Sequence, residues 1–169
     1  MFQIEIPKRD SQCSLGGELM APGLEYYSAL KINEGQESYK RLDYCVPCFE
    51  RLQKENKRGS YIGSFWKSTV PKKQALSELP KKKDDQALLL LKEALSSSED
   101  LAEEEAFLLS LYLARRRKIT YRQELLRFGK IFSLYEVVET EEMLAIPKID
   151  LSLLEIKTLQ IKLAKKFNE

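Results

Sequence analysis

Histidine is absent from this chain of 169 residues. The side chain best matched to proton transfer at neutral pH is therefore missing, and with it the most common general acid and base of enzymes. The seven glycines are scattered, and none forms a GxGxxG or GxxxxGK phosphate-binding loop. The one dense run of carboxylates, Glu103–Glu105, stands where the start of a helix favours negative charge. These absences predict a protein that is not an enzyme.

Long hydrophobic runs are also missing, and neither sign of charge predominates. No run approaches the roughly 20 apolar residues of a membrane-spanning helix, and residues 1–10 lack the apolar stretch of a signal peptide. The chain has 28 basic and 26 acidic residues, so a net charge of +2 gives little reason to expect nucleic acid. Three cysteines, an odd number that includes a CxxC pair, are typical of a reducing compartment. We expect a cytoplasmic protein without a membrane partner.

Hydrophobic residues make up 43% of the chain, which suits one domain or two small ones. Residues 25–32 and 37–43 carry aromatic and β-branched side chains suited to paired strands. Between them, Asn33–Gln36 contains a glycine and suits a tight turn. We therefore expect a β-hairpin here, followed by a short amphipathic helix that begins at Cys45 and Cys48.

A turn, a hairpin and a helix that begins with CxxC come in the order of a treble-clef zinc finger, and residues 10–60 resemble one. In that family the first half of the metal site is a Cys-x-x-Cys-Gly knuckle, whose glycine lets backbone amides point at the thiolates. Residues 13–17 read Cys-Ser-Leu-Gly-Gly, so Gly17 matches and Gly16 stands where the second cysteine belongs. The words Glu-Leu-x-x-Pro-Gly and Tyr-Tyr-Ser that follow are also similar to those of small bacterial proteins.

The resemblance implies a metal site with three of its four usual ligands, Cys13, Cys45 and Cys48. A structural zinc ion usually has four ligands, so water or a nearby oxygen would have to complete the site. Three side chains are candidates for this oxygen: Asp10, Glu18 and Asp43.

Other interpretations of the cysteines stay open. The module can have lost its metal and be held by the packing of its many aromatic rings, which is the interpretation we favour from the sequence. Alternatively Cys45 and Cys48 form a redox dithiol, since a helix start lowers a thiol's pKa and Pro47 resembles the proline of the thioredoxin motif. The strand before them is too polar for that fold. In the last interpretation the cysteines are simply buried. Zinc and the absence of a cofactor both remain open.

The rest of the chain predicts a second domain, so that the overall class is α+β. Residues 1–70 are expected to form the treble-clef-like module, 71–84 a lysine- and proline-rich linker, and 85–169 an α+β domain. Within the second domain we expect a helical hairpin over 85–117, a short helix over 122–127, strands over 130–139 and 143–149, and a final helix. A capping box at Ser152–Glu155 marks the expected start of that helix.

The function these features favour is that of a non-enzymatic cytoplasmic adaptor that binds another protein. Tyr61, Phe65 and Trp66 would anchor a partner if they are exposed, and would belong to the core if buried. Three consecutive cations, Arg115, Arg116 and Arg117, could contact phosphates, but the interpretation we favour is a solvated turn at the end of a helix. The alternative function is that of a nucleic-acid-associated zinc-binding protein, because treble clefs often serve in ribosomal and DNA-linked proteins.

Overall fold

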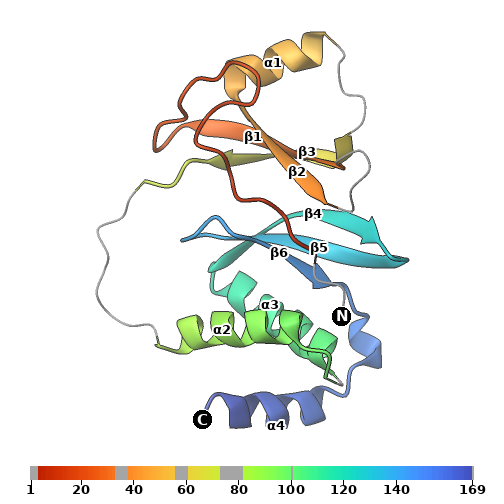
Figure 1. Ribbon diagram of the computed structural model, residues 1–169. Helices are drawn as coiled ribbons and strands as arrows, with labels where there is room; N and C mark the ends of the chain where they lie inside the picture. Colours follow the sequence, from red (N-terminus) through yellow and green to blue (C-terminus); the bar gives the residue numbers. More distant parts are fainter. Residues whose placement is uncertain (1–3, 33–37, 56–60, 73–81, 100, 169) are drawn as a thin grey trace. The chain divides into compact units, whose positions relative to one another are not determined.

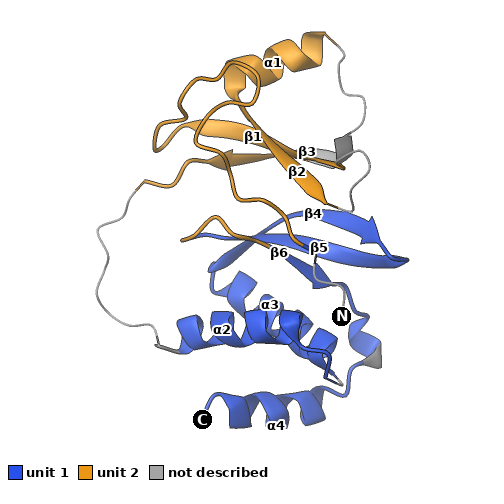
Figure 2. Ribbon diagram, viewed as in Figure 1, with its two compact units in different colours: residues 1–4, 78–138, 144–169 blue, residues 5–77, 139–143 orange. Residues whose placement is uncertain are grey.

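The computed structural model describes residues 4–32, 38–55, 61–72, 82–99 and 101–168. Its described part contains four α-helices and two three-stranded antiparallel sheets, which confirms the α+β class (Figure 1). The chain divides into two compact units (Figure 2). Unit 1 comprises Met1–Ile4, Glu78–Val138 and Leu144–Glu169, and unit 2 comprises Glu5–Ser77 and Glu139–Met143.

Unit 2 contains the predicted hairpin and the helix that follows it. Strand β1 (Glu25–Ile32) lies between β2 (Tyr39–Cys45) and β3 (Tyr61–Thr69), and pairs antiparallel with both. The turn predicted at 33–36 lies outside the described residues. Helix α1 (Val46–Lys54) follows β2 directly, so the predicted order of hairpin and helix is confirmed.

One face of this sheet packs against α1 through aromatic rings. Tyr27 of β1 stacks on Phe49 of α1 with 3.8 Å between ring centroids, and Phe65 of β3 meets Phe49 edge-on at 5.0 Å. Cys13, Tyr44, Phe49 and Cys48 are the buried residues of this small cluster. The opposite face of the sheet carries the buried polar side chains Ser28, Arg41 and Asp43.

Unit 1 contains the predicted helical hairpin, α2 (Lys82–Ser96) and α3 (Ala102–Arg115). Strands β4 (Ile119–Arg127), β5 (Lys130–Val137) and β6 (Met143–Pro147) follow and hydrogen-bond in that order, the first residue of β6 being grouped with unit 2. Its hydrophobic core joins the two helices to all three strands, through Ala87, Leu91, Ala94, Ala106, Leu109, Leu113, Ile119, Val137, Leu144 and Ile146.

The prediction of a short helix over 122–127 is wrong, because these residues belong to β4. Leucine, glutamate and arginine favour helices. Here, however, the end of the segment pairs with β5: Leu125 lies opposite Phe132, and Leu126 lies opposite Ile131. Two residues, Phe128 and Gly129, connect the strands, with φ of 51° and 73°. Positive φ at both central residues is the type I′ hairpin turn, and tertiary pairing therefore overrides local propensity.

The final helix begins later than its predicted capping box. Leu151–Leu153 form a 3₁₀ turn in which the Asp150 carboxylate accepts the Ser152 N–H at 2.9 Å, and α4 is Ile156–Lys166. Glu155 stands at the N-cap of α4 without a side-chain cap bond. The Ser152 hydroxyl also donates to the Asp150 carboxylate, so it does not cap α4, and the predicted capping box does not form.

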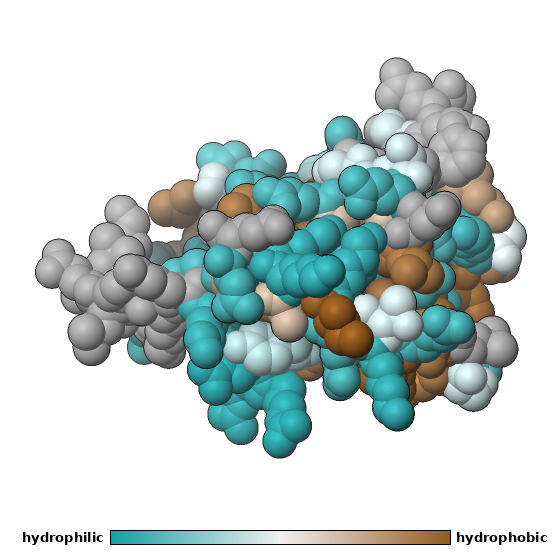
Figure 3. Space-filling view, turned by 90° about the horizontal axis from the view of Figure 1, so that it is seen from below, coloured by the Kyte–Doolittle hydropathy of each residue, from teal (hydrophilic) through white to brown (hydrophobic). Residues whose placement is uncertain are grey.

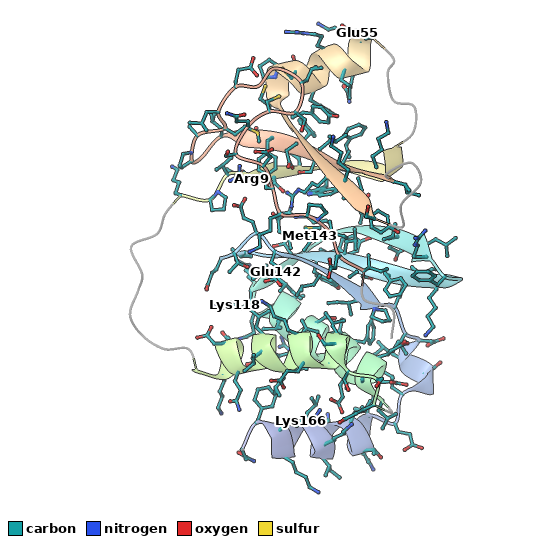
Figure 4. All side chains as sticks on the ribbon, in the orientation of Figure 1. Arg9, Glu55, Lys118, Glu142, Met143 and Lys166 are labelled. Carbon is teal, nitrogen blue, oxygen red and sulfur yellow. The ribbon has the colours of Figure 1, made fainter. Side chains whose placement is uncertain are left out.

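Helix α4 is held to the rest of unit 1 by both apolar and charged contacts. Leu159 is 1% exposed, and Leu163 and Phe167 pack against the core of the unit. Lys162 and Lys166 both reach the buried carboxylate of Glu105 on α3, with N–O distances of 2.6 and 2.7 Å (Lys166 is labelled in Figure 4). These contacts attach α4 to the rest of unit 1.

The predicted linker over 71–84 falls largely on residues 73–81, which lie outside the described residues, so the linker stays a prediction. Residues 139–143 group with unit 2, although they lie between two segments of unit 1 in the sequence. The sequence did not predict this grouping. There Glu141 pairs with Arg9 (labelled in Figure 4).

Among the described residues no helix is long and apolar enough to cross a membrane. Hydrophilic side chains cover most of the face drawn in Figure 3, as expected with 32% charged residues.

Candidate metal centre

The first half of the candidate site is a tight loop over residues 12–19. Gln12 and Leu19 form an isolated antiparallel bridge, and the Cys13 N–H donates to the Glu18 carbonyl at 2.8 Å. The Gly17 N–H returns to the Cys13 carbonyl at 2.9 Å, with a φ of 74° that glycine adopts without strain. The backbone therefore makes a tight turn over residues 13–17, where the sequence predicted a knuckle; we call this loop the knuckle.

Hydrogen bonds to β2 place this knuckle beside the second pair of cysteines. The Ser14 N–H donates to the Asp43 carbonyl at 2.7 Å, and the Ser14 hydroxyl accepts the Asp43 N–H at 3.0 Å. Asp43 lies two residues before Cys45, so the bonds bring Cys13 next to a residue 32 positions later. The tether was not predicted, because nothing in the sequence links a serine to a residue 29 positions away.

The second half of the site is the start of α1. Cys45 is its N-cap in an extended conformation, and Pro47 and Cys48 follow in the first turn. The first turn contains no acidic residue, so the sulfurs are the groups that can meet the positive end of the helix dipole. Proline suits this place, because the first N–H groups of a helix have no partner within it.

Four donor atoms converge where the two halves meet. The sulfurs of Cys13, Cys45 and Cys48 and a carboxylate oxygen of Glu18 all lie within 4.8 Å of one another. The Glu18 Oε2 atom is 4.0 Å from the Cys45 sulfur and 3.9 Å from the Cys48 sulfur. Zinc–sulfur bonds of about 2.3 Å in a tetrahedron place sulfurs ~3.8 Å apart. The four donors are thus close enough to hold one metal ion.

Hydrogen bonding and burial act differently on the three thiols. Burial raises the pKa of the Cys13 thiol, but N–H groups of Gly16, Cys45 and Leu15 outweigh it and bring that pKa below its usual value. The Cys45 N–H lies 3.4 Å from the Cys13 sulfur. Burial, together with the neighbouring thiols, raises the pKa of Cys48 to about 12. The backbone of the site therefore stabilises a thiolate at Cys13, which is the form of cysteine that binds a metal ion.

Two of the three oxygen candidates from the sequence lie outside this cluster. The Asp43 carboxylate is fully buried and accepts hydrogen bonds from the Ser28 hydroxyl, the Arg41 guanidinium and the Asp10 N–H. The Asp10 carboxylate accepts the Gln12 N–H at 3.2 Å, within its own turn. Among the described residues, Glu18 is the acidic side chain that the fold brings to the three sulfurs.

Of the candidate partner contacts, Phe65 packs against the same small cluster as Cys13 and Cys48. Trp66 is 6% exposed, with the Arg41 guanidinium carbon 5.5 Å from its ring centroid, and Phe65 is half-buried against α1. An anchor role requires exposure, and Trp66 does not meet that condition. The side chain of Tyr61 lies outside the described residues. The three arginines, Arg115, Arg116 and Arg117, are exposed at the end of α3. The Arg116 Nε atom forms an ion pair with the Asp84 carboxylate at 3.2 Å.

No protein-family model, curated protein or solved structure matches this chain. The interpretation of the site therefore depends on its own geometry: a knuckle and a helix start that bring three sulfurs and one carboxylate together.

Proposed function

We propose that this protein is a non-enzymatic binding protein whose treble-clef-like module is held together by a zinc ion at Cys13, Glu18, Cys45 and Cys48. The observation that supports this most directly is the convergence of those four donor atoms within 4.8 Å. They come from two chain segments far apart in sequence, so chance proximity in one loop does not account for them.

The donor set favours zinc over other metals. Thiolates are soft ligands that select zinc, copper(I) or iron–sulfur clusters, and hard cations such as Mg²⁺ and Ca²⁺ prefer oxygen. A mixed set of three sulfurs and one carboxylate oxygen suits the tetrahedral coordination of zinc, which accepts both donor types. Zinc has no redox chemistry of its own, so such a site agrees with a structural role.

The number of donors also supports a structural ion rather than a catalytic one. Catalytic zinc sites keep one position open for water or substrate, whereas four protein ligands close the site. Here an ion would connect the knuckle, which contains Cys13 and Glu18, to the junction of β2 and α1. Its contribution would be to stabilise unit 2, with no substrate at the metal.

We propose another cytoplasmic protein as the partner. The knuckle loop that a metal would stabilise carries two exposed leucines, Leu15 at 48% and Leu19 at 70%. Exposed apolar side chains are suited to contacts with another protein and not to contacts with phosphates. The net charge of +2 supports the same choice, because it offers little attraction for a polyanion.

The metal itself provides the first test. We expect protein purified without chelator to contain about one zinc ion per chain, and Cys48→Ser to lose it, because the remaining donors no longer complete a tetrahedron. Elemental analysis measures this, and Glu50→Ala, which changes an exposed carboxylate of α1, is the control. If the protein without zinc melts at the same temperature as the protein loaded with zinc, the result would instead support a module that aromatic packing alone holds together.

The binding role is tested with the zinc-loaded protein. A partner isolated with the wild-type chain should be lost when Leu15 and Leu19 are both changed to serine, with zinc content unchanged. Retention of the partner by that variant would contradict the role of the knuckle loop in binding.

A further inference from the structure

The Glu18 carboxylate lies against Gly16, in the space that a side chain at position 16 would occupy. A Cβ atom built on Gly16 would overlap both carboxylate oxygens of Glu18 and lie 2.5 Å from the Glu18 Cδ atom. Real Cβ atoms essentially never approach other atoms so closely. The Glu18 carboxylate thus fills the space that any side chain at position 16 would need.

Position 16 is where a treble-clef knuckle has its second cysteine. The loop keeps the turn of such a knuckle, with Cys13 before position 16 and the positive φ of Gly17 after it. From two residues further along, Glu18 directs its Oε2 atom toward the sulfurs of Cys45 and Cys48. The Glu18 carboxylate therefore lies in the space from which a cysteine side chain at position 16 would extend.

We propose that the Gly16–Glu18 pair is a ligand exchange that makes the zinc ion releasable. This inference rests on the proposed zinc site and adds how that site is regulated. In this proposal, Glu18 is the fourth ligand, and Gly16 is required for Glu18 to reach the ion. Zinc is released when the bond between Glu18 and the ion breaks. Unit 2 then responds to the supply of zinc, where a site with four thiolates would hold its ion permanently.

The burial of the four donors supports this asymmetry. Cys13 and Cys48 are 3% and 2% exposed, while Cys45 is partly buried and Glu18 is exposed. A carboxylate is a harder donor than a thiolate and a less favourable one for a soft site. Water or a competing chelator therefore reaches the ion most easily where Glu18 binds it.

Gly16→Ala separates the role of Glu18 from the folding of the loop. Gly16 is not among the glycines with positive φ, so alanine there causes no backbone strain. The atoms it would meet are at the end of a flexible side chain, which can move aside. The variant should therefore keep its knuckle and lose only the carboxylate ligand.

The experiment compares the rate at which zinc passes from the loaded protein to an excess of a chromogenic chelator. We expect Glu18→Ala and Gly16→Ala to release zinc about 10-fold faster than the wild type or more, since even outer-shell changes at metal sites cost 10- to 100-fold in affinity. The double variant Gly16→Cys with Glu18→Ala, which recreates the four-thiolate knuckle, should release it more slowly than the wild type. Glu50→Ala should match the wild type.

A cobalt(II) spectrum gives a second readout, because thiolate-to-metal charge-transfer bands grow with the number of bound thiolates. The double variant should show stronger bands than the wild type, and Gly16→Ala should keep the intensity of three thiolates. If zinc binds but leaves the wild type, Glu18→Ala and Gly16→Ala at one rate, the ligand exchange is wrong and the zinc site stands. If no form binds zinc, the proposed function itself fails.

Discussion

At the scale of single residues, the most consequential side chain outside the metal site is Asp43. The Arg41 and Asp43 side chains are 0% and 1% exposed, and the guanidinium Nε lies 3.0 Å from the carboxylate. Ser28 and the Asp10 backbone donate to the same carboxylate. Asp43 therefore connects the segment before the knuckle to two strands, although the sequence offered it as a metal ligand.

We predict that Asp43→Ala lowers the free energy of unfolding by about 3–5 kcal/mol, because it leaves a buried cation without the carboxylate that accompanies it. Urea unfolding of the zinc-loaded protein measures this. Glu50→Ala, at an exposed position, should change the free energy by no more than about 0.5 kcal/mol. Equal small effects of the two substitutions would show that the buried pair is not needed for stability.

At the scale of elements, the β4–β5 hairpin depends on its two-residue turn. Gly129 has a φ of 73°, and a Cβ atom added there would meet nothing within 4 Å. Any cost of substitution must therefore come from backbone strain and not from a clash.

Gly129→Val should destabilise the protein by about 1–2 kcal/mol, and Gly129→Asn by clearly less, because asparagine tolerates positive φ better than a β-branched residue. Thermal unfolding of the two variants and the wild type tests the order. Indistinguishable melting temperatures for valine and asparagine would mean that the turn relaxes to another conformation.

At the scale of the whole molecule, all four proposed zinc ligands belong to unit 2, within Glu5–Ser77. The core of unit 1 contains none of them and is formed by α2, α3 and the strands β4 to β6. Because a metal stabilises only the state that binds it, its removal should weaken the structure that contains its ligands.

We predict that a chelator increases amide hydrogen exchange in β1, β2 and α1 and leaves α2 and α3 nearly unchanged. Mass spectrometry of the exchanged peptides separates these segments, and chelator added to Cys48→Ser serves as the control, since that variant has no ion to lose. An equal rise in exchange over α2 and α3 would show that the two units unfold as one.

The sequence by itself determined the elements that local chemistry specifies. Tyrosines on both sides of a glycine-containing turn made the β1–β2 hairpin predictable, and Cys45-x-x-Cys48 marked the start of α1. The turn at 13–17 was expected from the resemblance of Cys13 and Gly17 to a treble-clef knuckle, and the structure has Gly17 at a φ of 74° there. In each case, the residues that decide the structure are neighbours in the chain.

Only the tertiary structure decided which oxygen joins the sulfurs. Asp10, Glu18 and Asp43 have the same carboxylate chemistry, but hydrogen bonds from Ser28 and from the Asp10 N–H, 15 and 33 positions away along the chain, hold the Asp43 carboxylate, while Glu18 is left at the cluster. The strand at 122–127 was hidden for the same reason, because its partner β5 outweighs the helix propensity of its residues. Hydrogen bonds and packing between distant parts of the chain therefore decide between residues whose local chemistry is the same.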